Sequence, residues 1–193
     1  MLVKQLTFCL LFSSLFLNAQ EEKERFLSIT YLGEFITHPG FEVSYAQAFK
    51  QISKFKKEKE IKYSFAYTAS LGNYIHYGSH FGSIVEAGIK RLKSKGKKCT
   101  RIVEFEIGYF RQFNLGETYI IQENGSAEKR LLTSRGYLLP SLSIGFASDI
   151  HKEQPIQLYS ALKIGGQLPY NTTIIPRVFL NIGITYKLSS NEN

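Results

Sequence analysis

The sequence predicts an all-β fold, an antiparallel up-and-down transmembrane β-barrel of eight strands. Three features predict it: an N-terminal export signal, seven stretches in which apolar residues alternate with small or polar ones, and no sustained helical period. In the clearest stretch, residues 62–77, Phe65 and Leu71 share one set of alternate positions, and Ser64 and Ser70 share the other. Because the side chains of a strand point alternately to its two faces, one face of this stretch meets lipid and the other a polar interior.

Residues 1–19 have the pattern of a cleaved secretory signal peptide. One basic residue, Lys4, precedes an apolar run over residues 6–17, and Asn18-Ala19-Gln20 follows it. An apolar run of about a dozen residues is too short to span a bilayer as a helix. We expect cleavage after Ala19, which leaves residues 20–193 as a single outer-membrane barrel domain.

Composition excludes several other classes of protein. The formal net charge is +8, but the basic residues gather in two segments, residues 50–62 and 90–98, which we interpret as solvated turns. A nucleic-acid surface is not expected in an exported protein. Cys99 is the only cysteine beyond the signal peptide, so an intramolecular disulfide framework is excluded.

The first strand is expected at residues 26–36. Leu27 and Ile29 alternate there with Ser28, although Gly33 and Glu34 interrupt the pattern. This strand is needed because single-chain barrels of the bacterial outer membrane have an even number of strands. The alternative is that the segment forms a short plug or an N-terminal extension.

Seven further strands follow in chain order, each with an apolar outward face. They are residues 41–50 (Phe41, Val43, Tyr45), 62–77 (Tyr63, Phe65, Tyr67), 81–93 (Val85, Ala87, Ile89), 101–113 (Phe105, Ile107, Tyr109), 135–150 (Leu138, Leu142, Ile144), 155–166 (Leu158, Leu162, Ile164) and 174–188 (Val178, Leu180, Ile182).

Eight strands with a periplasmic N-terminus determine which connections face outward. The outer loops are residues 38–40, 77–80, 114–134 and 168–173, and the inner turns are residues 51–61, 94–98 and 151–154. Within the longest outer loop, Asn124-Gly125 is a strong signal for a type I′ hairpin turn. We therefore expect a protruding outer β-hairpin within residues 114–135. Residues 51–61 are long for a periplasmic turn.

Three soft motifs carry a resemblance to a known family: Asn18-Ala19-Gln20, the stretch from Gly33 to Gly40, and the closing strand of residues 177–188. With the alternation, the chain resembles small eight-stranded outer-membrane barrels of the OmpA and OmpX type, particularly those of Bacteroidota. The resemblance implies a Gram-negative outer membrane, contact with its lipid and lipopolysaccharide, delivery by periplasmic chaperones and the barrel-assembly machinery, and no cofactor. Such barrels often end in an aromatic residue, whereas here Tyr186 precedes a polar tail.

Charged residues recur on the face opposite the apolar one. Ions removed from water must be paired, and an eight-stranded barrel has room for side chains and little else. We interpret these charges as an ion-pair network that fills a closed lumen; the alternative is a narrow conductive path or a ligand slot. The expected network comprises Glu42, Glu86, Lys90, Glu104, Glu106, Lys163 and Arg177.

Catalysis has one candidate site. Ser79 and His80, with His76 nearby, lie in an expected outer turn, where an enzyme that modifies lipid A or phospholipid would act. Adjacent side chains in a tight turn usually point apart, which weighs against this pair. We interpret His38 as a turn residue, and because the four histidines lack a metal-ligand spacing we expect no metal site.

The preferred function is therefore non-catalytic, with a structural or surface-interaction role. The outer hairpin is its expected contact site for a surface protein partner, through Tyr119, Ile121, Asn124 and Gly125. Two alternatives remain: a lipid-modifying enzyme of the outer membrane, and a soluble secreted β-barrel that binds a small apolar ligand. The last would need its apolar faces turned inward.

Overall fold

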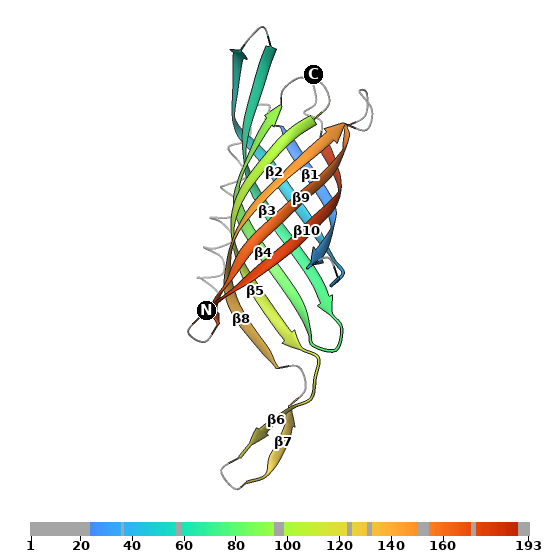
Figure 1. The fold of residues 1–193 in the computed structure, drawn as a ribbon, viewed down its shortest axis with the longest axis vertical. Helices are drawn as coiled ribbons and strands as arrows, with labels where there is room; N and C mark the ends of the chain where they lie inside the picture. Colours follow the sequence, from blue (N-terminus) through green and yellow to red (C-terminus); the bar gives the residue numbers. More distant parts are fainter. Residues whose placement is uncertain are drawn as a thin grey trace, which may run out of the picture.

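The computed structural model describes residues 24–35, 37–56, 59–94, 99–122, 125–130, 133–149, 155–170 and 173–188 (Figure 1). The expected signal peptide and Asn124 lie outside these residues. The described barrel strands are β1 (Arg25–Glu34), β2 (Gly40–Lys56), β3 (Lys59–His76), β4 (His80–Ser94), β5 (Cys99–Asn114), β8 (Ser134–Asp149), β9 (Ile156–Tyr170) and β10 (Thr173–Leu188). Two short strands, β6 (Thr118–Ile121) and β7 (Ala127–Arg130), form a separate sheet.

The eight long strands close into an antiparallel up-and-down barrel, which confirms the expected fold class. Each strand pairs with its neighbours, and β1 closes the ring against β10, from Arg25 opposite Leu188 to Glu34 opposite Phe179. The register of this closing pair runs without a break along all of β1. No helix within the described residues is long and apolar enough to cross a membrane.

In the first strand, inward and outward side chains alternate as far as Glu34, further than the sequence predicts. Ser28, Thr30, Leu32 and Glu34 are all buried, so Glu34 continues the inward series rather than interrupting it. The strand ends at Glu34, and the next residue, Phe35, has a φ of 46°, in the left-handed region. The expectation that Glu34 interrupts the alternation was wrong, because a carboxylate can occupy an inward position where Arg177 pairs with it.

Residues 51–61 do not form the long inner turn that was expected. The pairing of β2 with β3 continues to Lys56 opposite Lys59, so both strands extend beyond the barrel as a two-stranded extension. In Figure 1 this extension projects from the end of the barrel opposite to β6 and β7. Lysine-rich segments can pair as strands where both faces are solvated, since no core then selects an apolar alternation.

We call the end of the barrel that carries β6 and β7 the ribbon end, and the opposite end, where β1 begins and β10 ends, the terminal end (Figure 1). β6 and β7 pair from Thr118 opposite Arg130 to Ile121 opposite Ala127. Gly125 has a φ of 82° beside their turn, a conformation that glycine adopts without strain. This hairpin lies within residues 114–135.

The inside of the barrel is layered rather than polar throughout. Along β4, starting from the ribbon end, the inward side chains are His80, Ile84, Glu86, Lys90 and Leu92. Ile84 belongs to an apolar cluster near the ribbon end, and Leu92 packs against a second one near the terminal end. The first cluster comprises Leu32, Tyr74, Ile84, Phe110, Tyr137, Leu139 and Phe179. The charged layer therefore lies between two apolar layers.

Candidate functional site

One lysine organises the centre of the charged layer. The Lys163 Nζ on β9 lies 2.9 Å from Glu42 Oε2, 2.6 Å from Glu86 Oε2 and 2.9 Å from Glu106 Oε2. The three carboxylates come from β2, β4 and β5, and all four side chains are buried. Residues far apart in the chain meet here because each occupies an inward position at the same level of a narrow barrel.

Neutral donors bind the second oxygen of each of these carboxylates. Ser70 donates to Glu106 Oε1 at 3.2 Å and Ser141 to Glu86 Oε1 at 2.9 Å. Asn181 Nδ2 donates to Glu42 Oε1 at 2.8 Å. A buried charge is costly unless it is paired and hydrogen-bonded, so these three donors add to the stabilisation that Lys163 gives the carboxylates.

A second ion pair lies nearer the terminal end. Lys90 Nζ is 3.2 Å from Glu104 Oε2, and it lies 5.6 Å from the centre of the Tyr159 ring. Lys90 and Glu104, together with Lys163 and its three carboxylates, are six of the seven residues expected from the sequence. We call them the central network: Glu42, Glu86, Lys90, Glu104, Glu106 and Lys163.

Arg177, the seventh expected residue, does not contact the central network's carboxylates. Its Nη1 pairs with Glu34 Oε1, and its Nε and Nη2 donate to Gln167 Oε1 at 2.8 and 2.6 Å. The guanidinium also lies 5.3 Å from the centre of the Phe110 ring. Sequence reasoning missed both Glu34 and Gln167, although the alternation of β1 and β9 places each at an inward position.

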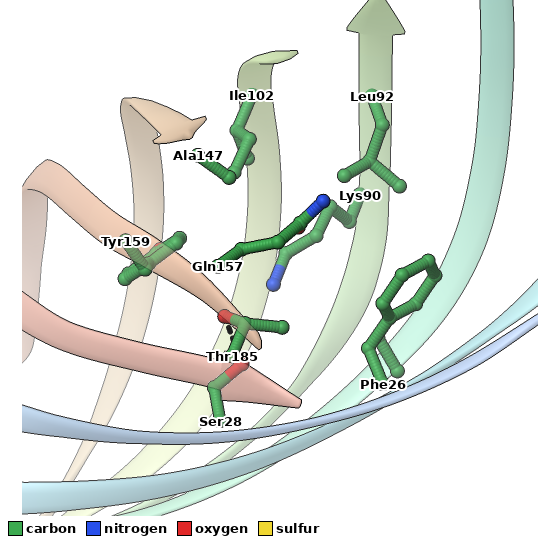
Figure 2. A pocket seen from close by; sticks show the side chains of 10 residues that line it. Phe26, Ser28, Lys90, Leu92, Ile102, Ala147, Gln157, Tyr159 and Thr185 are labelled. Carbon is green, nitrogen blue, oxygen red and sulfur yellow. Dashed lines mark hydrogen bonds between the residues drawn. The ribbon is translucent and has the colours of Figure 1, made fainter. Parts of the chain in front are cut away.

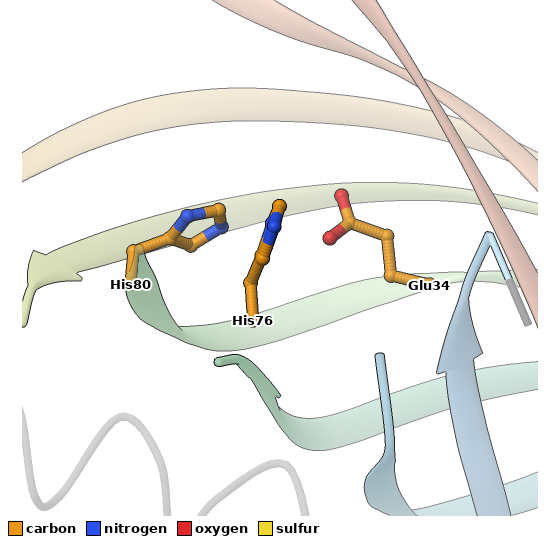
Figure 3. Close-up of side chains that lie close together, drawn as sticks. All are labelled: Glu34, His76 and His80. Atoms are coloured by element: carbon orange, nitrogen blue, oxygen red, sulfur yellow. The ribbon is translucent and has the colours of Figure 1, made fainter. Parts of the chain in front are cut away.

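Histidines gather at the ribbon end beside this pair. The His38 and His76 rings stack with centroids 3.7 Å apart, and the His76 and His80 centroids are 5.1 Å apart. One ligand atom each from Glu34, His76 and His80 lies within 4.8 Å of the others (Figure 3). Their sequence spacing gives no metal motif, but His76 pairs with His80 across β3 and β4, and an isolated bridge joins Glu34 to His38. We call Glu34, His38, His76, His80 and Arg177 the rim cluster.

Ser79 and His80 are in contact, although adjacent side chains in a turn were expected to point apart. Ser79 Oγ lies 3.0 Å from His80 Nδ1, and Tyr74 Oη lies 3.2 Å from His80 Nε2. Ser79 is exposed and His80 is buried, and the turn that contains Ser79 also contains Gly78 at a φ of 75°. The group on the far side of the imidazole is a phenol, not the carboxylate that orients the base of a catalytic triad.

The terminal end of the lumen contains a small cavity (Figure 2). Its empty volume is about 290 Å³, which includes open solvent. Lys90 and Tyr159 line it together with Ser28 and Thr185, whose hydroxyls are 2.8 Å apart. The cavity therefore adjoins the Lys90–Glu104 pair and lies at the opposite end of the lumen from the rim cluster.

The β6–β7 hairpin exposes its apolar residues. Tyr119 and Ile121 are exposed, Ile121 by 77%. Lys129 forms an ion pair with Glu117, and Tyr119 donates to Glu117 Oε2 at 2.6 Å. These two partners hold the pKa of Glu117 below its usual value. The hairpin therefore presents an apolar side chain beside a charge-assisted hydrogen-bond network.

Comparison with models of protein families gives no match, and neither does comparison with curated proteins. Solved structures do match. The outer membrane enzyme PagL is 7% identical with a TM-score of 0.53, and the alignment covers 84% of this chain and 99% of that one. Neisserial surface protein A is 11% identical with a TM-score of 0.47, covering 87% and 98%. Ail, the attachment invasion locus protein of Yersinia pestis, is 13% identical with a TM-score of 0.43, covering 87% and 100%.

The likeness to PagL supports the barrel fold alone, because the sequence identity is too low to transfer an activity. Nothing in these comparisons supports the expected likeness to proteins of Bacteroidota. The function must therefore be argued from the side chains of this chain.

Proposed function

We propose that this protein is an outer-membrane β-barrel, exported through a cleaved signal peptide, with a closed lumen and a structural or surface-interaction role. The observation that carries the proposal is the distribution of side chains across the barrel wall. On β8, Leu142 and Ile144 face outward and are 47% and 57% exposed, whereas Ser143 between them is 2% exposed. Apolar side chains thus line the outside of the wall and polar ones the inside.

This distribution favours a hydrocarbon environment over water. Exposed apolar residues occur on all eight barrel strands, among them Ile29, Val43, Leu71, Val85, Ile107, Ile144, Ile164 and Ile182. Soluble monomers rarely expose a contiguous apolar patch larger than a few hundred Å². A secreted barrel that carries an apolar ligand would need these residues inside, where the structure instead has glutamate and lysine. Outer-membrane lipid and lipopolysaccharide are the partners that would cover this belt.

The filling of the lumen supports a closed barrel rather than a pore. Lys163, Glu86 and Glu106 are at most 3% exposed. On the side of the ribbon end, the apolar cluster that includes Phe110 fills the adjoining layer of the lumen. An eight-stranded barrel has an interior just wide enough for such side chains. A steady ionic current would require both layers to open.

The β6–β7 hairpin is the part best suited to contact another molecule. Its two strands pair only with each other, so each retains an edge of backbone groups to which a further strand can be added. Tyr119 and Ile121 lie exposed on β6. We propose a surface protein as partner, with periplasmic chaperones and the barrel-assembly machinery acting only during biogenesis.

Cell fractionation combined with a heat-modifiability gel tests the location, and planar bilayers test the lumen. We expect the protein in the outer-membrane fraction, with a mobility that changes on boiling, and no steady current from purified protein. Recovery in the soluble fraction would overturn the membrane assignment. A reproducible unit conductance would overturn the closed lumen.

A lipid-modifying enzyme at the outer rim is the second candidate, favoured by the 3.0 Å contact between Ser79 Oγ and His80 Nδ1. Mass spectrometry of lipid A and phospholipids from cells with and without the protein tests it. An altered acyl pattern that disappears in the Ser79→Ala variant would establish this candidate. Unchanged lipids would favour the non-catalytic role.

A further inference from the structure

Three side chains of the rim cluster place metal-binding atoms close together. Glu34 ends β1, His76 ends β3 and His80 begins β4, and their nearest ligand atoms lie within 4.8 Å of one another. In Figure 3 the His76 ring lies between the His80 ring and the Glu34 carboxylate. A tetrahedral zinc ion with ligand bonds of about 2.0–2.1 Å needs donor atoms about 3.3 Å apart. Small side-chain rotations are therefore sufficient to bring these donors into range.

A buried oxygen without a hydrogen bond points to a ligand in this space. Glu34 is 0% exposed, and its Oε1 is taken by Arg177. Its Oε2 has no hydrogen bond of ordinary geometry among the described residues, and the same holds for His38 Nδ1, which lies 3.5 Å from it. The Tyr74 hydroxyl also interacts with this carboxylate. Leaving a buried carboxylate oxygen unsatisfied is costly. Glu106 Oε2 of the central network also lacks a hydrogen bond, but it lies 2.9 Å from the Lys163 ammonium, whereas Glu34 Oε2 lies 3.5 Å from a histidine nitrogen.

The groups behind the three donors resemble the outer shell of a metal site. Arg177 fixes the carboxylate of Glu34 and is itself held by Gln167. Hydroxyl groups of Ser79 and Tyr74 lie beside the two nitrogens of His80, so whichever nitrogen binds an ion, the other retains a partner. Such outer partners orient ligands and tune their basicity in known metal sites.

Charge and donor type decide which ion fits. The charged groups that face the space are Glu34 and Arg177, whose charges cancel, so simple attraction of a cation is weak. Neutral imidazole nitrogens supply most of the binding, which suits zinc and similar transition metals and not calcium or magnesium, which prefer oxygen ligands. His76 and His38 are partly exposed, so an ion can reach the site from the ribbon end.

We propose that Glu34, His76 and His80 bind one divalent transition-metal ion of the zinc type at the ribbon end of the barrel. Two histidines and a glutamate leave a fourth coordination position for water or for His38. The ion links the end of β1, the end of β3 and the start of β4, between the apolar cluster and the ribbon end of the barrel. The site is separate from the proposed closed lumen and does not depend on the protein's location or on its partner.

Isothermal titration calorimetry with ZnCl₂ tests the site, using chelator-treated protein folded in detergent and free of any polyhistidine tag. We expect one zinc ion per chain, no heat from CaCl₂, and a loss of affinity of about tenfold or more in the His76→Ala, His80→Ala and Glu34→Gln variants. His151→Ala is the matched control, since it removes a histidine that is not one of the three proposed ligands.

Folding of each variant is checked by heat modifiability, and His76→Ala is the most informative because His76 is only partly buried. Absorption of the Co²⁺-loaded protein gives a second readout: a tetrahedral visible spectrum is expected and should be lost in folded His76→Ala. Absence of stoichiometric zinc binding, or equal affinity in the wild type and the His76→Ala/His80→Ala double variant, would overturn the proposal.

Discussion

The central network and the rim cluster differ in how they stabilise buried carboxylates. Both bury carboxylates inside a barrel, and each has a carboxylate oxygen without a hydrogen bond, Glu106 Oε2 in the centre and Glu34 Oε2 at the rim. In the centre that oxygen lies 2.9 Å from the Lys163 ammonium, whereas at the rim it lies 3.5 Å from His38 Nδ1. The buried carboxylates in the middle of the lumen therefore have a cation of the protein itself at every ion-pairing oxygen, and the carboxylate at the rim has one oxygen that faces histidines.

The largest effect should come from the central network. Lys163→Met leaves three buried carboxylates without their shared cation, and breaking a buried pair costs about 3–5 kcal/mol. Urea unfolding in detergent should show a loss of this size or a failure to fold. Lys62→Met is the control, because its contact with Glu60 is 3.8 Å long and exposed, and it should change stability by less than about 1 kcal/mol. Equal effects of the two changes would mean that the network is hydrated.

The next effect concerns the outward face of the barrel wall, which the proposed function places in lipid. Leu142→Arg places a charge on the outward face of β8 and should cost about 2–4 kcal/mol if that face is at the bilayer midplane. Ser143→Ala, one residue away but inward, should change little. Insertion into vesicles, followed by heat modifiability, measures both. Comparable tolerance of the two changes would contradict the assigned outward face.

A smaller effect distinguishes the rim from the centre. In a double-mutant cycle, Arg177→Met should couple to Glu34→Gln by about 1–3 kcal/mol, since the single changes strand a buried charge. Coupling of Arg177→Met to Glu42→Gln should be close to zero, because no ion pair joins them. Unfolding free energies of the four proteins in each cycle provide the measurement. A strong coupling to Glu42 would place Arg177 in the central network.

The smallest effect lies in the exposed hairpin. The pKa of Glu117 is lowered by Lys129 and Tyr119, so the pair stabilises the hairpin above the usual carboxyl pKa and loses its effect as pH falls through the lowered value. Lys129→Ala should raise the pKa of Glu117 toward its ordinary value, as followed by carboxyl chemical shifts in NMR titration. Global stability should remain unchanged, as expected for an exposed pair. An unaltered titration would show that the pair does not form in solution.

Much of this fold can be predicted from the pattern of residues within single strands. Alternation along single strands predicts the closed eight-stranded barrel and places Glu42, Glu86, Lys90, Glu104, Glu106 and Lys163 on the inward face, where they are found. The inward direction of a side chain depends only on whether its position is odd or even along its own strand. No knowledge of the neighbouring strands is needed for that inference.

Partners across the lumen were decided only by the tertiary structure. Arg177 pairs with Glu34, and His76 and His80 come together with Glu34, through the register of strands that are distant in the chain. The extension of β2 and β3 beyond the barrel also depends on pairing, since its lysines show no apolar alternation. Which residues share a level inside a barrel is set by strand tilt and stagger, which are properties of the closed ring and not of any one segment.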